Sequence, residues 1–174
     1  MSADIENKVA NSGLITISLE DFHQKGDRVL FDIKPLLWQE LALKEKDFRA
    51  FIKQNDWSQY QNKFVAITCS ADAIVPTWAF MLIAIALQPY VKKVIFGNLS
   101  DLERELYIDS INHFDLNSIA DKRVLVKGCG DINIPDSAFI YVSEKFIPVV
   151  KSLMFGEACS NVPLYKKAKS QLKK

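Results

Sequence analysis

Three short apolar runs occur in the chain from residue 64 onward, and a longer segment with helical spacing follows each of them. Continuous apolar runs of this length are typical of strands that are buried on both faces of a parallel sheet. The runs cover residues 64–67, 94–96 and 124–126. The segments after them predict helices over residues 73–87, 100–113 and 137–155.

The chain before residue 64 has a weaker pattern of apolar and polar positions. We expect a strand at residues 14–19 and a second extended element at residues 29–33. A helix is expected from Pro35 to about Gln54, because apolar residues recur along it between charged ones. At the other end of the chain, residues 160–174 are expected to add a short terminal helix.

Two of the predicted helices carry capping signals. Asp72 precedes the apolar helix and can accept hydrogen bonds from its first amides. Ser100 and Glu103 have the spacing of a capping box, in which each side chain accepts from the backbone of the other residue.

Strands that alternate with helices indicate right-handed crossovers in one open sheet. We therefore predict a single α/β domain over residues 1–174, with an open, mostly parallel sheet of three to five strands and helices on both faces. Residues 1–12 are interpreted as a loose N-terminus and residues 166–174 as a lysine-rich tail. We identify no internal repeat and no linker that would divide the chain.

Composition narrows the class of protein. The 174 residues are 49% hydrophobic and 25% charged, which is enough apolar material for a core without disulfides. The formal net charge of +1 does not favour nucleic acid as a partner. The apolar stretch at residues 73–87 is shorter than the roughly 20 residues that span a bilayer, and the acidic N-terminus does not resemble a secretion signal. These features predict a cytoplasmic protein with no membrane segment and with its three cysteines kept as thiols.

Two of the cysteines follow predicted strands directly. Cys69 and Cys129 both come within three residues of the end of an apolar run and precede a helix. Ligands bind at the carboxyl ends of parallel strands, so the two sulfurs can share a site if their strands are neighbours. Gly128 and Gly130 allow close approach of a ligand to the backbone, and Asp72 is a candidate oxygen ligand.

Cys159 can join the other two cysteines only under a condition. It follows the predicted helix over residues 137–155, which would carry it away from the strand ends unless Pro148 turns the chain back. A further metal ligand would come from Asp72, Glu157, His113 or His23, and zinc and iron are the candidate metals. Because no C-x-x-C spacing occurs, the alternative that the cysteines are packing residues stays open.

Segments around these cysteines resemble a known family. Residues 127–130 and 149–166, together with residues 69–79 and 44–49, are similar to an uncharacterised bacterial family, domain-of-unknown-function family 2480. The resemblance implies that the cysteine segments characterise the family and that its members are associated with iron–sulfur assembly systems. It implies no activity and no ligand set.

Two functional hypotheses follow, and neither of them is enzymatic. The first is a cytosolic accessory protein whose cysteines bind a metal or carry sulfur, with iron–sulfur assembly proteins as partners. The second is a homodimeric interaction or scaffolding protein in which the cysteines are structural. An enzyme with a pocket at the strand ends is a third alternative, but the chain has no phosphate-binding loop, no dinucleotide fingerprint and no nucleophile elbow, so no catalytic residue is nominated.

Overall fold

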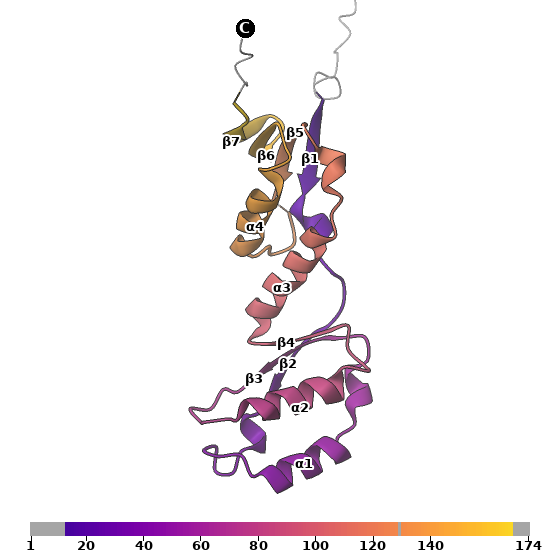
Figure 1. Ribbon diagram of the computed structural model, residues 1–174, viewed down its shortest axis with the longest axis vertical. Coiled ribbons are helices and arrows are strands. Elements are labelled where there is room, and N and C mark those ends of the chain that lie inside the picture. Colours follow the sequence, from indigo (N-terminus) through magenta and orange to yellow (C-terminus); the bar gives the residue numbers. More distant parts are fainter. Residues whose placement is uncertain (1–12, 129, 169–174) are drawn as a thin grey trace, which may run out of the picture. The chain divides into compact units, whose positions relative to one another are not determined.

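The computed structural model describes residues 13–128 and 130–168, and they form two compact α/β units (Figure 1). Unit 2 consists of residues 25–105. Unit 1 consists of the described residues before and after that stretch, so unit 2 is inserted into the chain of unit 1. Each unit has its own sheet and its own hydrophobic core. Among the described helices, none combines the length and the apolar character needed to cross a membrane.

Unit 2 is a three-stranded parallel sheet with the strand order β2-β3-β4. Helices α1 and α2 lie on the same side of the sheet and contribute to one core (Figure 1). The central strand β3 is buried along four of its five residues, as its continuous apolar run predicts. The elements are β2 (Arg28–Asp32), α1 (Glu45–Gln54), β3 (Phe64–Thr68), α2 (Thr77–Leu87) and β4 (Lys93–Phe96).

Unit 1 is a four-stranded sheet with the order β1-β5-β6-β7, in which only β7 is antiparallel. Helix α4 packs on this sheet and supplies the buried residues Ala138, Val142 and Phe146. The elements are β1 (Leu14–Ser18), β5 (Arg123–Lys127), α4 (Asp136–Phe146), β6 (Ser152–Glu157) and β7 (Ser160–Lys166). Helix α3 (Leu99–Asn112) begins in unit 2 and ends in unit 1. Single turns of 3-10 helix complete the fold: η1 (Leu19–Phe22), η2 (Lys34–Leu36), η3 (Trp57–Tyr60) and η4 (Leu116–Ile119).

The two units are copies of one repeat, which the sequence prediction missed. Residues 56–98 align without a gap with residues 115–157, so that Pro76 corresponds to Pro135 and Phe96 to Phe155, 59 positions later. The order strand, helix, strand, helix, strand is the same in both, with β2-α1-β3-α2-β4 matching β1-α3-β5-α4-β6. The prediction that the chain has no internal repeat is therefore wrong.

The hydrogen bonds of the two copies match as well. The amide of Asn62 donates to the carbonyl of Tyr90 at 2.8 Å, and the equivalent Asp121 donates to Val149 at 2.8 Å. Asn62 and Asp121 both have positive φ, as do the equivalent Gly97 and Gly156. A chain that conserves left-handed turns at the same places in both copies has kept the connections between its strands.

The predicted fold class is confirmed, but the strands form two sheets instead of one. The protein is α/β, its strands are mostly parallel and helices pack on its sheets. The strands divide between two sheets, because strand pairing is a long-range choice that an apolar run does not encode. The single-domain assignment stays a prediction, since two compact units can still unfold together.

Three predicted helices have different bounds or are replaced. In place of a helix from Pro35 to Gln54, one turn of 3-10 helix and a tight loop precede α1, which begins only at Glu45. The predicted helix over residues 137–155 is α4 followed by β6. Pro148 lies in the turn between α4 and β6, because a proline interrupts the hydrogen bonding of a helix. The terminal helix expected after residue 160 is wrong, because β7 occupies residues 160–166.

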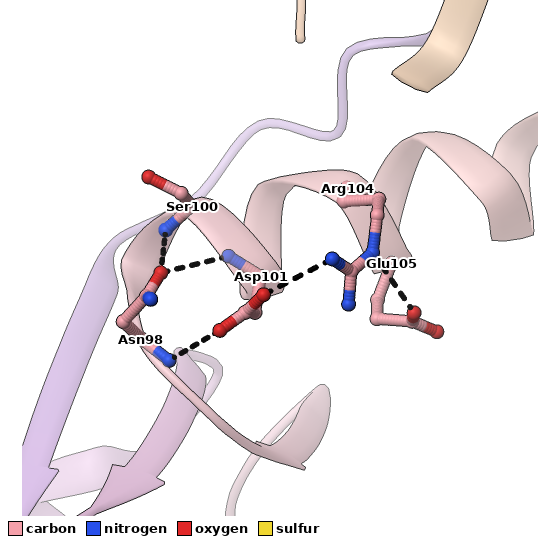
Figure 2. A network of polar contacts seen from close by, with 5 residues as sticks. All are labelled: Asn98, Ser100, Asp101, Arg104 and Glu105. Atoms are coloured by element: carbon pink, nitrogen blue, oxygen red, sulfur yellow. Dashed lines mark hydrogen bonds and ion pairs between the residues drawn. The ribbon is translucent and has the colours of Figure 1, made fainter. Parts of the chain in front are cut away.

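Both predicted caps are also corrected. Helix α2 begins at Thr77 with Pro76 before it, so Asp72 is not its cap. The capping box of α3 is formed by Asn98 and Asp101 (Figure 2): the Asn98 side chain accepts from the amides of Ser100 and Asp101 at 2.8 and 3.0 Å, and Asp101 accepts from the amide of Asn98 at 2.9 Å. The box lies two residues earlier than the sequence indicates, because the polar run offers two overlapping spacings.

Candidate functional site

In unit 2, a carboxylate holds the loop at the carboxyl edge of the sheet. Asp32 ends β2 and accepts hydrogen bonds from the amides of Lys34 at 2.9 Å and Ser70 at 3.0 Å, and from the Ser70 hydroxyl. Burial raises the pKa of Asp32, but the hydrogen bonds from Ser70 and Lys34 and the positive charge of Lys34 outweigh burial. The pKa therefore lies below its ordinary value. Asp32 therefore stands at this edge as an ionised carboxylate that accepts three hydrogen bonds.

Cys69 lies in the same loop and is partly packed. Its side chain is half-buried against the core of unit 2, and its sulfur lies 3.7 Å from the carbonyl oxygen of Ala71. Asp72 is exposed three residues later. This setting suits a packing role, because a free cysteine in an apolar setting behaves as a small hydrophobic residue, and the ligand role of Cys69 stays a prediction.

The carboxyl edge of unit 1 is built from different residues. Glu20 accepts a hydrogen bond from the amide of Ile132 at 3.1 Å and so anchors the loop after β5. Two side chains approach the glycines at the start of this loop closely: a Cβ on Gly130 would overlap the Glu20 carboxyl group, and one on Gly128 would overlap the Phe139 ring. Lys127 and Glu157 form an ion pair at 2.9 Å across the ends of β5 and β6.

The arrangement of the three cysteines that the sequence predicts depends on which strands are neighbours. The condition for a Cys69 and Cys129 pair was that their strands be neighbours, but β3 and β5 belong to different sheets. Cys129 itself lies outside the described residues. Cys159 is exposed in the turn between β6 and β7. Strand β6 runs parallel to β5, so the chain turns back in the segment that contains Pro148. Glu157 and Cys159 therefore lie at the edge of the sheet where β5 ends, as the condition for Cys159 requires.

No metal centre is assembled among the residues that the structure describes. Within them, no three His, Cys, Asp or Glu side chains lie close enough together to hold an ion. His113 is exposed at the end of α3, where its Nδ1 lies 2.7 Å from the Asp109 carbonyl. His23 closes the η1 turn. The ligand assignments of Asp72, Glu157 and the cysteines therefore remain predictions.

Two equivalent apolar hollows are the features that sequence reasoning missed. One hollow, of about 410 Å³, lies between α2 and β4, and the other, of about 620 Å³, lies between α4 and β6. An edge-to-face aromatic pair stands in each: Phe80 with Phe96 at 4.9 Å, and Phe139 with Phe155 at 5.6 Å between ring centroids. The repeated Ala-Phe at residues 79–80 and 138–139 is the sequence signal that identifies them.

The hollows differ at one wall. In unit 1, Leu164 of β7 lines the hollow beside β6. In unit 2 the hollow is lined only by β3, α2 and β4, among them Ile67, Met81 and Phe96. Phe96 is 68% exposed, whereas its counterpart Phe155 is half-buried. The fourth strand thus adds a wall to the unit 1 hollow that the unit 2 hollow lacks.

Comparison with known proteins agrees with the family resemblance. A family model described as Protein of unknown function (DUF2480) matches residues 3–167, which include both units. No curated protein matches the chain, and no solved structure matches it. Because the match covers nearly the whole sequence, the chain belongs to the DUF2480 family of proteins of unknown function.

Proposed function

We propose that this chain is a non-catalytic interaction protein that associates with a second copy through the outer edge of β4. The observation that carries the proposal is the difference between the two copies of the repeat. Strand β6 of unit 1 is covered by the antiparallel strand β7, whereas the equivalent β4 pairs only with β3 among the described residues. An open strand edge next to apolar side chains favours pairing with another strand.

The backbone of β4 offers groups for such pairing. The amide of Gly97 donates to the carbonyl of Ile67 in β3 at 2.9 Å. In a strand, the N–H and C=O of one residue point to one side and those of the next residue point to the other side. Since the amide of Gly97 points toward β3, the amide and carbonyl of Phe96 point toward the outer edge. An added strand would therefore find hydrogen-bonding groups beside the exposed Phe96 ring.

The side chains around this edge suit an apolar contact. Met81 and Ile85 of α2 are 58% and 64% exposed, and Leu99 at the start of α3 is 43% exposed. In unit 1, the strand that pairs with the equivalent edge contributes Leu164 to the wall of the equivalent hollow. A partner strand for β4 thus needs an apolar side chain directed into the unit 2 hollow.

The chain's own β4 meets this requirement. In an antiparallel pair centred on Ile95, Val94 of one copy lies opposite Phe96 of the other, and Lys93 lies opposite Gly97. The register places apolar residues together and sets no lysine against another lysine. It is also self-complementary, as a two-fold interface requires.

The oligomeric state of the full chain tests this proposal. Light scattering after size exclusion should give the mass of a dimer for the wild type and of a monomer for Phe96→Lys. The matched control is Ile140→Lys, because Ile140 is the counterpart of Met81 on α4 and is 72% exposed, so this variant loses a similar apolar side chain without touching β4. A monomeric wild type, or equal dissociation by both variants, would refute the β4 interface.

Cross-linking tests the register. In an Ile95→Cys variant, the two new thiols face each other across the two-fold axis at a spacing that permits a disulfide. Mild oxidation should therefore yield a cross-linked peptide that contains residue 95. If the only cross-links are those that the wild type also forms through its native cysteines, the register is wrong.

A cysteine-centred accessory protein for metal or sulfur is the second candidate function, with iron–sulfur assembly as its setting. The return of Glu157 and Cys159 to the edge where β5 ends favours it, because Cys129 follows the last residue of β5 by two positions in the sequence. Untagged wild-type protein should then contain zinc, iron or labile sulfide. The Cys129→Ser and Cys159→Ser variants should each contain less of it. Cys69→Ser is the control in the other unit, and equal contents in all four proteins would exclude this function.

A further inference from the structure

The amino edge of the unit 1 sheet gathers four cationic side chains. Strands β5 and β6 begin at this edge and β7 ends there, so Arg123 lies beside Ser152 and Ser152 lies beside Lys166. The amide of Lys167 donates to the carbonyl of Lys151 at 2.9 Å and holds the end of β7 against the start of β6. The register of three strands therefore brings together residues that are far apart in sequence.

These side chains surround a hollow of about 440 Å³. The surface of the hollow is mostly apolar, and its lining residues include four cations and the hydroxyl-bearing Ser152 and Tyr165. The lining residues are Arg123, Lys151, Ser152, Met154, Pro163, Tyr165, Lys166 and Lys167.

None of the four cations has a carboxylate partner within the described part of the chain. The side chains of Arg123, Lys151, Lys166 and Lys167 form no ion pair and no hydrogen bond there. Other cations of the same protein are paired, as the Arg28–Glu103 contact at 2.9 Å shows. Four uncompensated charges around one hollow repel each other, and a bound anion would relieve that repulsion.

The other copy of the repeat lacks this cluster. The counterpart of Arg123 is Phe64, which is buried, and the counterpart of Lys151 is Lys92. The Lys92 ammonium lies 5.3 Å from the centre of the Phe64 ring and donates to the Lys25 carbonyl. A structural lysine in one copy has thus become part of an unpaired cationic group in the other, and β7 supplies two of its members.

We propose that this hollow binds a small soluble ligand that carries a phosphate or polyphosphate group. The planar guanidinium of Arg123 suits two phosphate oxygens at once, and the three lysine ammonium groups supply further charge. The Ser152 hydroxyl and the apolar wall of Met154 and Pro163 offer contacts to the rest of such a ligand. This inference is independent of the association through β4, which concerns the other unit.

Calorimetric titration of the full chain with inorganic pyrophosphate and tripolyphosphate tests the site. We expect saturable binding that weakens with salt and that falls at least about tenfold in the double variant Arg123→Gln/Lys151→Gln. The matched control is Lys46→Gln/Lys53→Gln on α1, which removes the same charge from exposed positions in unit 2 and should change affinity less than about twofold.

Several results would overturn the proposal. Absence of pyrophosphate and tripolyphosphate binding would refute it. Equal weakening of binding in both double variants would show that only the net charge of the protein matters, which would also refute a specific site. Binding only to vesicles with anionic lipid, or only to an oligonucleotide, would assign the cluster to a different partner. The monomeric Phe96→Lys variant should bind pyrophosphate like the wild type, so failure of this site and failure of the β4 interface are separable.

Discussion

The two copies of the repeat share their cores and differ at their edges. Equivalent positions such as Ala79 and Ala138, or Leu87 and Phe146, are fully buried in both. The carboxyl edge of one copy carries Cys69 and Ser70 where the other carries Gly128 and Cys129, and only unit 1 has a fourth strand. Packing has been conserved while edges have diverged, which places the features that suit binding at the edges.

The largest expected effect tests whether the two cores act together. Phe146→Ala should lower the free energy of unfolding by about 3–5 kcal/mol, and the equivalent Leu87→Ala by about 2–5 kcal/mol, because both side chains are fully buried. Since unit 2 interrupts the chain of unit 1, we expect both variants to shift one common transition in calorimetry. Two separate transitions, each sensitive to one variant, would contradict the single-domain prediction.

A second substitution makes unit 1 resemble unit 2. Gly128→Ala introduces a Cβ where the equivalent Cys69 already has one, and this Cβ overlaps the Phe139 ring. The variant should lose about 1–3 kcal/mol of stability in urea titration, because the ring must move from its contact with Phe155. The Cys69→Ala variant is the control. If Gly128→Ala is as stable as the wild type, the close approach of Phe139 is not a constraint.

The start of α3 allows a smaller test. Asn98→Ala removes the side chain that accepts from two helix amides, and should destabilise the protein by about 1 kcal/mol. Ser100→Ala should be near neutral, because the Ser100 hydroxyl forms no hydrogen bond with any residue that the structure describes, and only its amide takes part in the cap. The reverse order of effects in thermal unfolding would restore the capping box that the sequence suggested.

The smallest expected effect is a pH dependence that belongs to unit 2. The pKa of Asp32 is lower in the folded protein, so its ionised form stabilises the fold above the unfolded pKa of about 3.9, and this contribution is lost as pH falls through the folded value. The stability difference between wild type and Asp32→Asn should therefore shrink below about pH 4. A difference that is constant from pH 6 to pH 3 would show that charge at Asp32 is irrelevant.

The sequence predicted local structure well where burial alone determines it. The runs that form β3 and β5 are predicted correctly, because a strand with both faces covered must be apolar along its buried length. The run that forms β4 is also predicted correctly, although β4 is only partly buried. The division of these strands between two sheets could not be predicted from burial, since β3 and β5 have nearly the same sequence of apolar residues. The equality of these patterns, with Pro76 and Pro135 at matching places, is the signal of the repeat.

The candidate site was predicted in parts. Cys69 does lie directly after a strand, and Cys159 does return to the end of β5, but the pairing of Cys69 with Cys129 required neighbouring strands. The apolar hollows and the cationic edge could not be predicted from the sequence, because each arises from strand register. Register brings together residues as distant as Arg123 and Lys166. Single-residue chemistry is visible in a sequence, but such juxtapositions are not.

The insertion of unit 2 into unit 1 has a consequence for synthesis. Strand β1 is translated first, yet its partner β5 follows only after all of unit 2 has been made, since Leu14 pairs with Arg123. Unit 2 contains all of its own strands between Arg28 and Phe96, so it can fold on the nascent chain while β1 waits with Ile15 and Ile17 uncovered. A ribosome that pauses within the segment encoding α3 would prolong the time in which β1 is open to wrong partners.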